Sequence, residues 1–207
     1  MRRGAERPGA SSSGDRTIRV DVRRNRDAIL ASASAAFSQR GVGASLEDIA
    51  RDAGVGSATL HRHFRGRNAL IAAVYRSDIE DLCTEVDDFL ARSPADEALA
   101  EWMCLAVERT MARRGMAVAL KATADEMTEF HDITVIMRSA LTRLLAEAAA
   151  QGLIRGDVSA REMVHALGGF CLFDDQPGAS NRALRLVRLL VDGLRHGTED
   201  RGGQNSQ

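Results

Sequence analysis

Residues 45–64 read SLEDIARDAGVGSATLHRHF, a stretch that predicts two short helices joined by a tight turn. Ser45 and Asp48 have the spacing at which side chains cap the free amides of a helix start. A single apolar stripe at helical spacing follows, made of Leu46, Ile49, Ala50 and Ala53. Gly54 ends this first helix, because glycine adopts the left-handed conformation at little steric cost.

The second helix begins at Gly56 or Ser57, either of which can act as its cap. Leu60 and Phe64 are four residues apart and therefore point inward together. The outward positions are small at the start and polar or cationic further on: Ser57, Ala58, His61, Arg62 and Arg65. Small residues let a helix approach base edges, and hydroxyl, imidazole and guanidinium groups reach phosphates and guanine acceptors. The second helix is therefore predicted to contact DNA in the major groove.

Charge is distributed unevenly along the 207 residues, although the formal net charge is only -1. Residues 1–67 hold 13 arginines and 7 acids, a balance of +6, which leaves -7 for the remainder. A basic end and an acidic end fit a DNA-binding head joined to a body that DNA does not touch.

Other classes of protein find little support in the sequence. Cys83, Cys104 and Cys171 are widely spaced and odd in number, as expected of buried free thiols in the core of a cytoplasmic protein. No apolar run is long enough for a membrane helix, and the N-terminal residues show no apolar segment of the kind used for export. His61 and His63 lack a nearby acid or thiol at zinc-ligand spacing, and Asp125, Glu126, Glu129 and His131 are more typical of a solvated helix face than of a hydrolytic cluster. We therefore predict no enzyme, no metal site and no cofactor.

Helical periodicity continues on both sides of the quoted stretch, and no strand pattern competes with it. A supporting helix is predicted from about Val22 to Gly41, and a connecting helix from about Asn68 to Ala91. Ser93-Pro94 begins a helix that runs to about Arg113. Further helices are expected over about 116–127, 128–151, 159–173 and 181–195, with Gly115 and Gly152 as breaks. The fold class is all-α, with a three-helix head followed by a helical bundle.

The domain boundaries follow from these patterns. We predict a flexible arginine-containing arm over 1–18, a helix-turn-helix domain over 19–66, a helical domain over 67–197 and a disordered tail over 198–207. Two interpretations of this arm remain open. It is a disordered extension without a function of its own, or it helps to bind DNA through arginines that reach phosphates or an adjacent minor groove, namely Arg16, Arg19, Arg23 and Arg24.

From Ser45 to Leu70 the sequence SLEDIARDAGVGSATLHRHFRGRNAL resembles the signature of TetR/AcrR-type transcriptional regulators across its whole length. The resemblance implies that Ser45 contacts a phosphate and that Ser57 and Ala58 lie near bases. It also places Thr59 and His63 at phosphates, His61 and Arg62 in or beside the groove, and Arg67 at a phosphate near the start of the connecting helix. Gly56, His61 and Arg67 depart from the usual serine, tyrosine and lysine, which leaves DNA binding intact but means that the resemblance does not specify the operator sequence.

For the rest of the chain the resemblance rests on helix number and order. It implies a homodimer through about 159–173 and 181–195 and a small-molecule pocket between the connecting helix and the helices after it. Gly168-Gly169 marks either the dimer seam, our preferred interpretation, or a close crossing within the chain. Methionine and scattered aromatic residues suit an adaptable pocket and an ordinary core equally well, and the candidates are Trp102, Met103, Met111, Met116, Met127, Phe130, His131, Met137 and Phe170.

The function that these expectations imply is a ligand-responsive repressor that binds a palindromic DNA operator as a homodimer. The alternative is an architectural or ligand-independent DNA-binding protein, against which the acidic second part of the chain argues.

Overall fold

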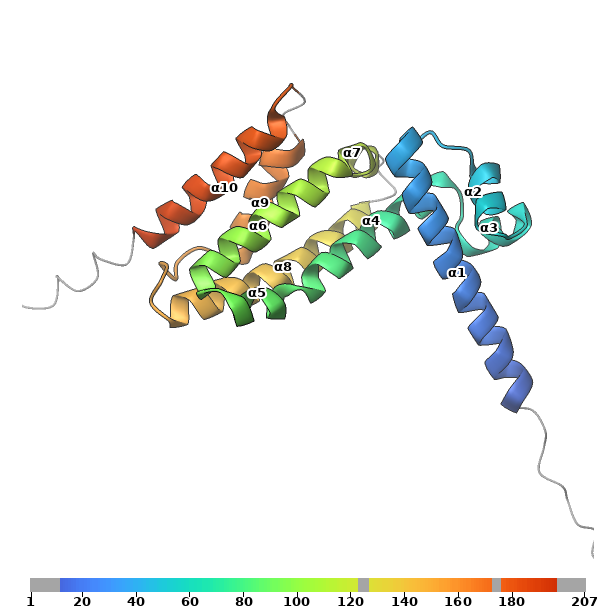
Figure 1. The fold of residues 1–207 in the computed structure, drawn as a ribbon, viewed down its shortest axis with the longest axis horizontal. Helices are drawn as coiled ribbons and strands as arrows, with labels where there is room; N and C mark the ends of the chain where they lie inside the picture. The colour runs from blue at the N-terminus through green and yellow to red at the C-terminus, as the bar shows by residue number, and fades with distance from the viewer. Residues whose placement is uncertain (1–11, 123–126, 173–175, 197–207) are drawn as a thin grey trace, which may run out of the picture. The chain divides into compact units, whose positions relative to one another are not determined.

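The computed structural model describes the backbone of residues 12–122, 127–172 and 176–196, and the side chains of residues 20–122, 131–172 and 176–196. Every regular element in these ranges is an α-helix, as predicted (Figure 1). The chain forms two compact units, Met1–Leu70 and Ile71–Gln207, which we call the head and the body. The division falls four residues beyond the boundary expected from sequence, inside the helix that continues into the body.

Three helices form the head: α1 (Ser12–Arg40), α2 (Leu46–Asp52) and α3 (Ser57–His63). Their core consists of apolar residues that are at most 5% exposed, namely Ile29, Ala33, Ala36, Phe37, Ala44, Ile49, Ala50, Leu60 and Phe64. The Ser32 hydroxyl donates to the Ile49 carbonyl at 3.0 Å and so ties α1 to α2. Gly41, at φ 74°, ends α1 where the sequence predicted its end.

The first helix begins ten residues earlier than its predicted start at Val22. The prediction of a flexible arm over residues 1–18 is therefore wrong for residues 12–18, and residues 1–11 lie outside the described part. The apolar pattern could not reveal this extension because its sequence contains no apolar stripe at helical spacing. Its helix is favoured instead by arginine, a good helix former, and by the four-residue spacing of Asp15 and Arg19.

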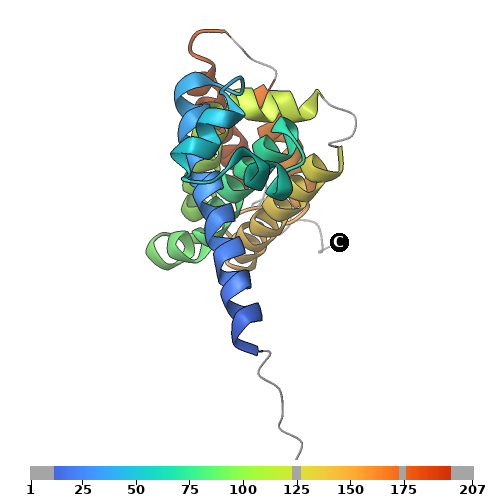
Figure 2. The ribbon, with the colours of Figure 1, turned by 90° about the vertical axis from the view of Figure 1, so that its right-hand side faces the viewer.

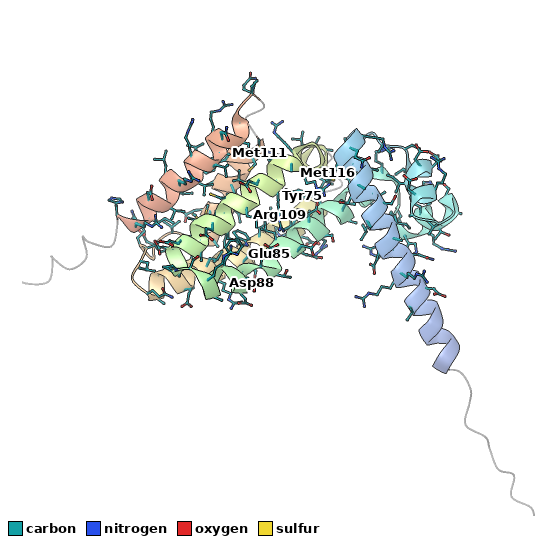
Figure 3. All side chains as sticks on the ribbon, in the orientation of Figure 1. Tyr75, Glu85, Asp88, Arg109, Met111 and Met116 are labelled. Carbon is teal, nitrogen blue, oxygen red and sulfur yellow. The ribbon has the colours of Figure 1, made fainter. Side chains whose placement is uncertain are left out.

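The connecting helix is interrupted, whereas the sequence predicted one element to about Ala91. The structure has α4 (Arg67–Thr84) and α5 (Val86–Arg92), separated at Glu85. The Thr84 hydroxyl donates to the Asp81 carbonyl at 2.7 Å, a local bond that competes with helical continuation. Glu85 pairs with Arg109 at 2.6 Å, and Figure 3 labels both residues.

The remaining helices of the body are α6 (Ala95–Ala112), α7 (Arg114–Lys121), α8 (Met127–Ala150), α9 (Ala160–Leu172) and α10 (Ala179–Arg195). Helix α6 packs against α10, α8 and α5, and α8 packs against α9. Trp102 of α6 is fully buried, and its indole N–H donates to the Leu82 carbonyl at 3.1 Å. Arg113, at the C-terminal end of α6, pairs with Asp78 of α4 at 3.0 Å.

Several predicted start and stop signals of the body are confirmed. Ser159 and Glu162 form both halves of a capping box, with bonds of 2.7 and 3.3 Å to each other's backbone amides. Gly152, at φ 71°, follows the end of α8.

Gly115 was expected to separate two helices, but it lies inside α7. The break is at Arg113, where φ is -109° and ψ is 15°.

The three cysteines are free, as predicted. Cys171 is buried in α9, as predicted, whereas the prediction of a core position is wrong for Cys83 and Cys104, which are half-buried. Burial raises the pKa of the Cys83 and Cys171 thiols to about 11. Arg114 lies at the end of α9, where its Nε and Nη2 donate to the carbonyls of Cys171 and Leu172 at 3.1 and 3.0 Å. A cation that bonds the last carbonyls of a helix also stabilises the helix dipole.

Candidate nucleic-acid interface

The first helix of the quoted stretch is capped by Ser45, as the sequence predicted. Ser45 has an extended backbone, and its Oγ accepts from the Asp48 amide at 3.3 Å. The reciprocal half of the capping box is absent at this helix, because the Asp48 carboxylate pairs with Arg51. The Ser45 hydroxyl donates instead to Glu47 at 3.0 Å, and hydrogen bonds from the Glu47 amide and from Ser45 lower the pKa of the Glu47 carboxyl.

The turn between α2 and α3 closes with two backbone hydrogen bonds. The Val55 amide donates to the Ala50 carbonyl at 2.9 Å and the Gly54 amide to the Arg51 carbonyl at 3.0 Å. These are the two bonds of a Schellman motif, and Gly54 has the left-handed φ of 69° that the motif requires. The predicted stop signal is thus confirmed, and the turn fixes the direction in which α3 leaves α2.

Helix α3 has one buried anchor and one exposed face. Leu60 is 0% exposed, and Phe64, directly after the helix, is 3% exposed. The four residues expected near bases, Ser57, Ala58, His61 and Arg62, are all exposed. Thr59 and His63, expected at phosphates, are half-buried at the flanks. The structure therefore places the predicted base-side residues together on the side of α3 away from its anchor.

The start of α3 carries no side-chain cap. Gly56 is the N-cap and has no side-chain hydrogen bond to the helix. The Thr59 amide is bonded to the Gly56 carbonyl at 2.9 Å within the turn. At the other end the Arg62 guanidinium donates to the Thr59 hydroxyl at 3.3 Å, an exposed contact along the same helix.

Arg67 has a role that the sequence did not show. Its Nη1 donates to the carbonyls of Val42 and Ala44 at 2.7 and 2.5 Å, across 25 and 23 residues of sequence. These carbonyls belong to the loop that leads into the Ser45 cap. Arg67 therefore holds the start of α2 in place, while its Nε and Nη2 take no part in these two bonds.

Arg26 is a further head residue that sequence reasoning did not select as a site. Its guanidinium carbon lies 4.8 Å from the centroid of the Phe64 ring, a cation–π contact between α1 and the end of α3. Helical spacing alone could not have paired positions 38 residues apart. The contact sets which side of α1 faces the recognition helix.

The predicted pocket residues occupy different environments in the body. Trp102, Met103, Met116 and Met137 are buried, Met111 and Phe170 are half-buried, and His131 is exposed. Met111 and Met116 lie near the junction of α6 and α7 (Figure 3). The side chains of Met127 and Phe130, like those of Asp125, Glu126 and Glu129, lie outside the described residues. Within the described side chains, no group of three His, Cys, Asp or Glu residues could hold a metal ion.

The predicted dimer helices carry apolar surface on α10. Its buried side consists of Ala183, Val187, Val191 and Leu194, whereas Leu184 and Leu190, which the helical pattern also directs inward, are only half-buried. Leu186 and Leu189 point outward and are 42% and 67% exposed. On α9, a Cβ added to Gly168 or Gly169 would meet nothing within 4 Å. Among the described residues, no neighbouring atom therefore requires a glycine at either position.

Comparisons with known proteins identify the class. Residues 29–74 match the family described as bacterial regulatory proteins of the tetR family, and residues 94–196 match the C-terminal domain of SbtR-like transcriptional regulators. A TetR transcriptional regulator from Streptomyces coelicolor is 44% identical, over 82% of this chain and 98% of that one, with a TM-score of 0.65. The chain belongs to the TetR family and is a transcriptional regulator with a DNA-binding helix-turn-helix.

Two further solved structures share the fold. A TetR regulator from Mycobacterium vanbaalenii is 29% identical over 86% of this chain and 99% of that one, with a TM-score of 0.61. FadR from Bacillus subtilis, solved in complex with stearoyl-CoA, is 17% identical over 81% of this chain and 98% of that one, with a TM-score of 0.61. The family consists of DNA-binding regulators, and in the described part of this chain no helix is long and apolar enough to cross a membrane.

Proposed function

We propose that the protein is a cytoplasmic, ligand-responsive repressor whose homodimer places two α3 helices in successive major grooves of a palindromic operator. The observation that carries this proposal is the exposed face of α3. Small residues, Ser57 and Ala58, lie at its start, and His61 and Arg62, with imidazole and guanidinium groups, follow one turn later; all four are exposed, whereas Leu60 is fully buried. Such a face combines close approach to base edges with donors for guanine and phosphate.

Phosphate contacts are proposed for Ser45, Thr59, His63 and Arg67, which surround that face. The Nε and Nη2 of Arg67 are the nitrogens that would reach a phosphate, because Nη1 holds the 42–44 loop. The hydrogen bond from the Ser45 hydroxyl to Glu47 would have to break before that hydroxyl could donate to a phosphate instead. These contacts position the head on the duplex, whereas the α3 face reads the sequence.

The homodimer is proposed to form through α9 and α10. Leu186 and Leu189 provide exposed apolar surface, and Gly168 and Gly169 leave room for a close helix approach from a second copy. Leu189→Glu should yield a monomer by light scattering, since it places a charge in the seam. The matched control is Val118→Glu, which changes an exposed apolar residue of α7 and should leave the dimer intact.

The operator and its spacing provide the direct test of function. Fragments of genomic DNA selected by the protein should share two inverted half-sites whose centres lie roughly 34–36 Å apart, or a multiple of that distance. Arg62→Ala should weaken binding to the selected site, whereas Arg138→Ala, an exposed change on α8 away from the proposed dimer helices, should not. Recovery of no common sequence would contradict the proposed function.

The effector is proposed to bind within the body, among the predicted pocket residues such as Trp102, Met103 and Met116. Its binding would favour a state in which the spacing of the two heads does not match the operator. The complex of FadR with stearoyl-CoA makes acyl-CoA thioesters reasonable first compounds to test. A true effector should raise the melting temperature and lower operator affinity together, because only a ligand that prefers one state shifts the equilibrium. A broad screen without such a compound would favour a ligand-independent regulator.

A further inference from the structure

A groove of about 360 Å³ lies in the head between α1 and the end of α2. Its α1 side consists mostly of alanine, and Ala31 and Ala35 there are exposed. Arg40 of α1 and Asp52 of α2 are also among its lining residues. None of these side chains takes part in the proposed DNA contacts. We call this surface the α1 groove.

The α1 groove lies on the side of α1 away from the recognition helix. Arg26 stacks on Phe64, the residue after α3, and so marks the side of α1 that meets α3. Ala28, Ala31 and Ala35 lie about 140–180° round α1 from Arg26. A second macromolecule can therefore reach the α1 groove without displacing α3.

Small side chains give the α1 groove room for another helix. Positions 28, 31, 32 and 35 are alanine or serine and lie on one side of α1. Side chains of this size let two helix axes approach to about 8 Å. The same side of α1 continues before the groove, and Figures 1 and 2 show the first part of α1 extending past α2 and α3. A helix lying in the groove would therefore meet this earlier part of α1 as well.

Charged residues lie at both ends of this side of α1, in opposite order. Asp21 and Arg24 come seven and four residues before Ala28, which places them on its face, and both are exposed. Arg40 and Asp52 lie at the other end, 3.9 Å apart, with side chains 46% and 54% exposed. An ion pair so exposed contributes little to stability, and each member can accept a second partner.

A second copy of α1 matches this charge order when it lies antiparallel. Asp21 and Arg40 are equally distant from the midpoint between positions 30 and 31. Two antiparallel helices centred there place Asp21 of each copy level with Arg40 of the other, and Arg24 one turn from that level, within reach of Asp52. A parallel arrangement would bring like charges together instead. The charge order therefore selects an antiparallel, two-fold symmetric contact.

We propose that the α1 groove is a self-association site, in which α1 of a second copy packs antiparallel with Asp21 opposite Arg40 and Arg24 opposite Asp52. The contact uses neither α9 nor α10, so it joins two homodimers into a larger assembly. Residues 21–40 of two helices bury less than the roughly 1,600 Å² of a standard interface, so the association is weak. It becomes significant where the local concentration is high, as for dimers bound at neighbouring DNA sites.

Sedimentation velocity of the full chain over a concentration series, without DNA, provides the first test. The wild-type dimer should form a tetramer as the concentration rises. Ala35→Arg should prevent this, because a long side chain in the α1 groove holds the helices apart. The matched control is Ala91→Arg, the same change at an exposed position of α5, which should leave the tetramer intact. Alanine and arginine are both strong helix formers, so circular dichroism should be unchanged in either variant.

Charge reversal tests the ion pairs. Arg40→Glu should weaken tetramer formation about tenfold, since two symmetric exposed pairs are lost, and Asp21→Arg should do the same. Asp21→Arg/Arg40→Glu should restore the association, because each copy again presents opposite charges in the same register. Arg23→Glu is the control, since Arg23 is exposed but lies about 140° round α1 from Ala28. It should leave the association unchanged.

Crosslinking tests the register. In the antiparallel contact the two copies of position 31 lie about 1.5 Å apart along the helix axis, whereas those of position 38 lie about 22 Å apart. Ala31→Cys should therefore crosslink with a short bis-maleimide that cannot span the second distance, and Ser38→Cys, also exposed, should not. The wild type, with its three native cysteines, gives the background. Equal crosslinking at the two positions would refute the antiparallel register.

A wild type that remains dimeric at every concentration would overturn the proposal and leave the α1 groove to a partner of another kind. A tetramer that persists in Ala35→Arg would overturn it as well, because another surface would then carry the contact. Failure of the double charge reversal to restore association would exclude the ion pairs. None of these measurements uses DNA, so each of these outcomes leaves the proposed operator binding, tested by Arg62→Ala, unaffected.

Discussion

Arg67 provides the sharpest test of how the head is built. In the structure its Nη1 donates to the carbonyls of Val42 and Ala44 at 2.7 and 2.5 Å. Replacing it with methionine keeps most of the aliphatic stem and removes both bonds. Hydrogen bonds to charged groups contribute about 1.5–3 kcal/mol each, and water can replace part of this at a half-buried site. We therefore expect the loop to lose about 2 kcal/mol of stability in total.

The assay is amide hydrogen exchange, because it reports local opening rather than the unfolding of the whole chain. A loss of about 2 kcal/mol corresponds to roughly 30-fold faster exchange, since about 1.4 kcal/mol is tenfold. The acceleration should appear at the Asp48 and Ile49 amides, which open with the Ser45 cap, and not at the amides of α10. Arg65→Met, an exposed change two residues away, should leave all of these amides unchanged.

The same variant separates the two roles of Arg67 in DNA binding. If its Nε and Nη2 also hold a phosphate, Arg67→Met should reduce the salt slope by about 0.9 per protomer in addition to the change in exchange. Faster exchange with an unchanged slope would make Arg67 a positioning residue and remove it from the phosphate contacts. Exchange within about threefold of the wild type would refute the reasoning from the 42–44 loop.

Three further changes test other parts of the fold. Gly54→Ala should cost about 1–2 kcal/mol in chemical denaturation because φ is 69° there, whereas Gly43→Ala, at a position without positive φ, should stay near the wild type. Trp102→Phe removes the donor to the Leu82 carbonyl and should lower the free energy of unfolding by about 1–3 kcal/mol, measured by circular dichroism. Burial raises the pKa of the Cys171 thiol from 9.0 to about 11, so the stability from burying this neutral thiol should be complete below pH 9.0 and lost as the pH rises towards 11. Labelling of Cys171 at about pH 8 should accordingly be slow in the native protein and fast in urea; equal rates would contradict its burial.

Local chemistry made several elements predictable. Ser45, Gly54 and the Ser159/Glu162 capping box act through hydrogen bonds that span only three to five residues. The spacing of these residues in the sequence was therefore sufficient to predict where the helices begin and end. The inward Leu60 and the outward Ser57 follow from helical periodicity alone. For the same reason the base-side face of α3 could be identified from the order of its residues.

Where several effects of similar size compete, the sequence pattern was misleading. The extension of α1 has no apolar stripe, so composition suggested an arm, and the interruption of the connecting helix falls at Glu85, whose carboxylate pairs with Arg109, 24 residues away. Gly115 was expected to break a helix, but a single glycine costs only about 1 kcal/mol, which tertiary packing readily offsets.

The sequence by itself determined the family, the all-helical fold and the residues that face outward from α3, because each of these depends on contacts within one or two helical turns. The tertiary structure decided which side of α1 meets the recognition helix, that Arg67 supports the 42–44 loop, and that Leu186 and Leu189 of α10 are left exposed. Those three facts depend on pairs of residues far apart in the chain, or on the faces that neighbouring helices leave uncovered. Helical periodicity predicts which residues share one face of a helix, whereas the packing of neighbouring helices determines what covers that face.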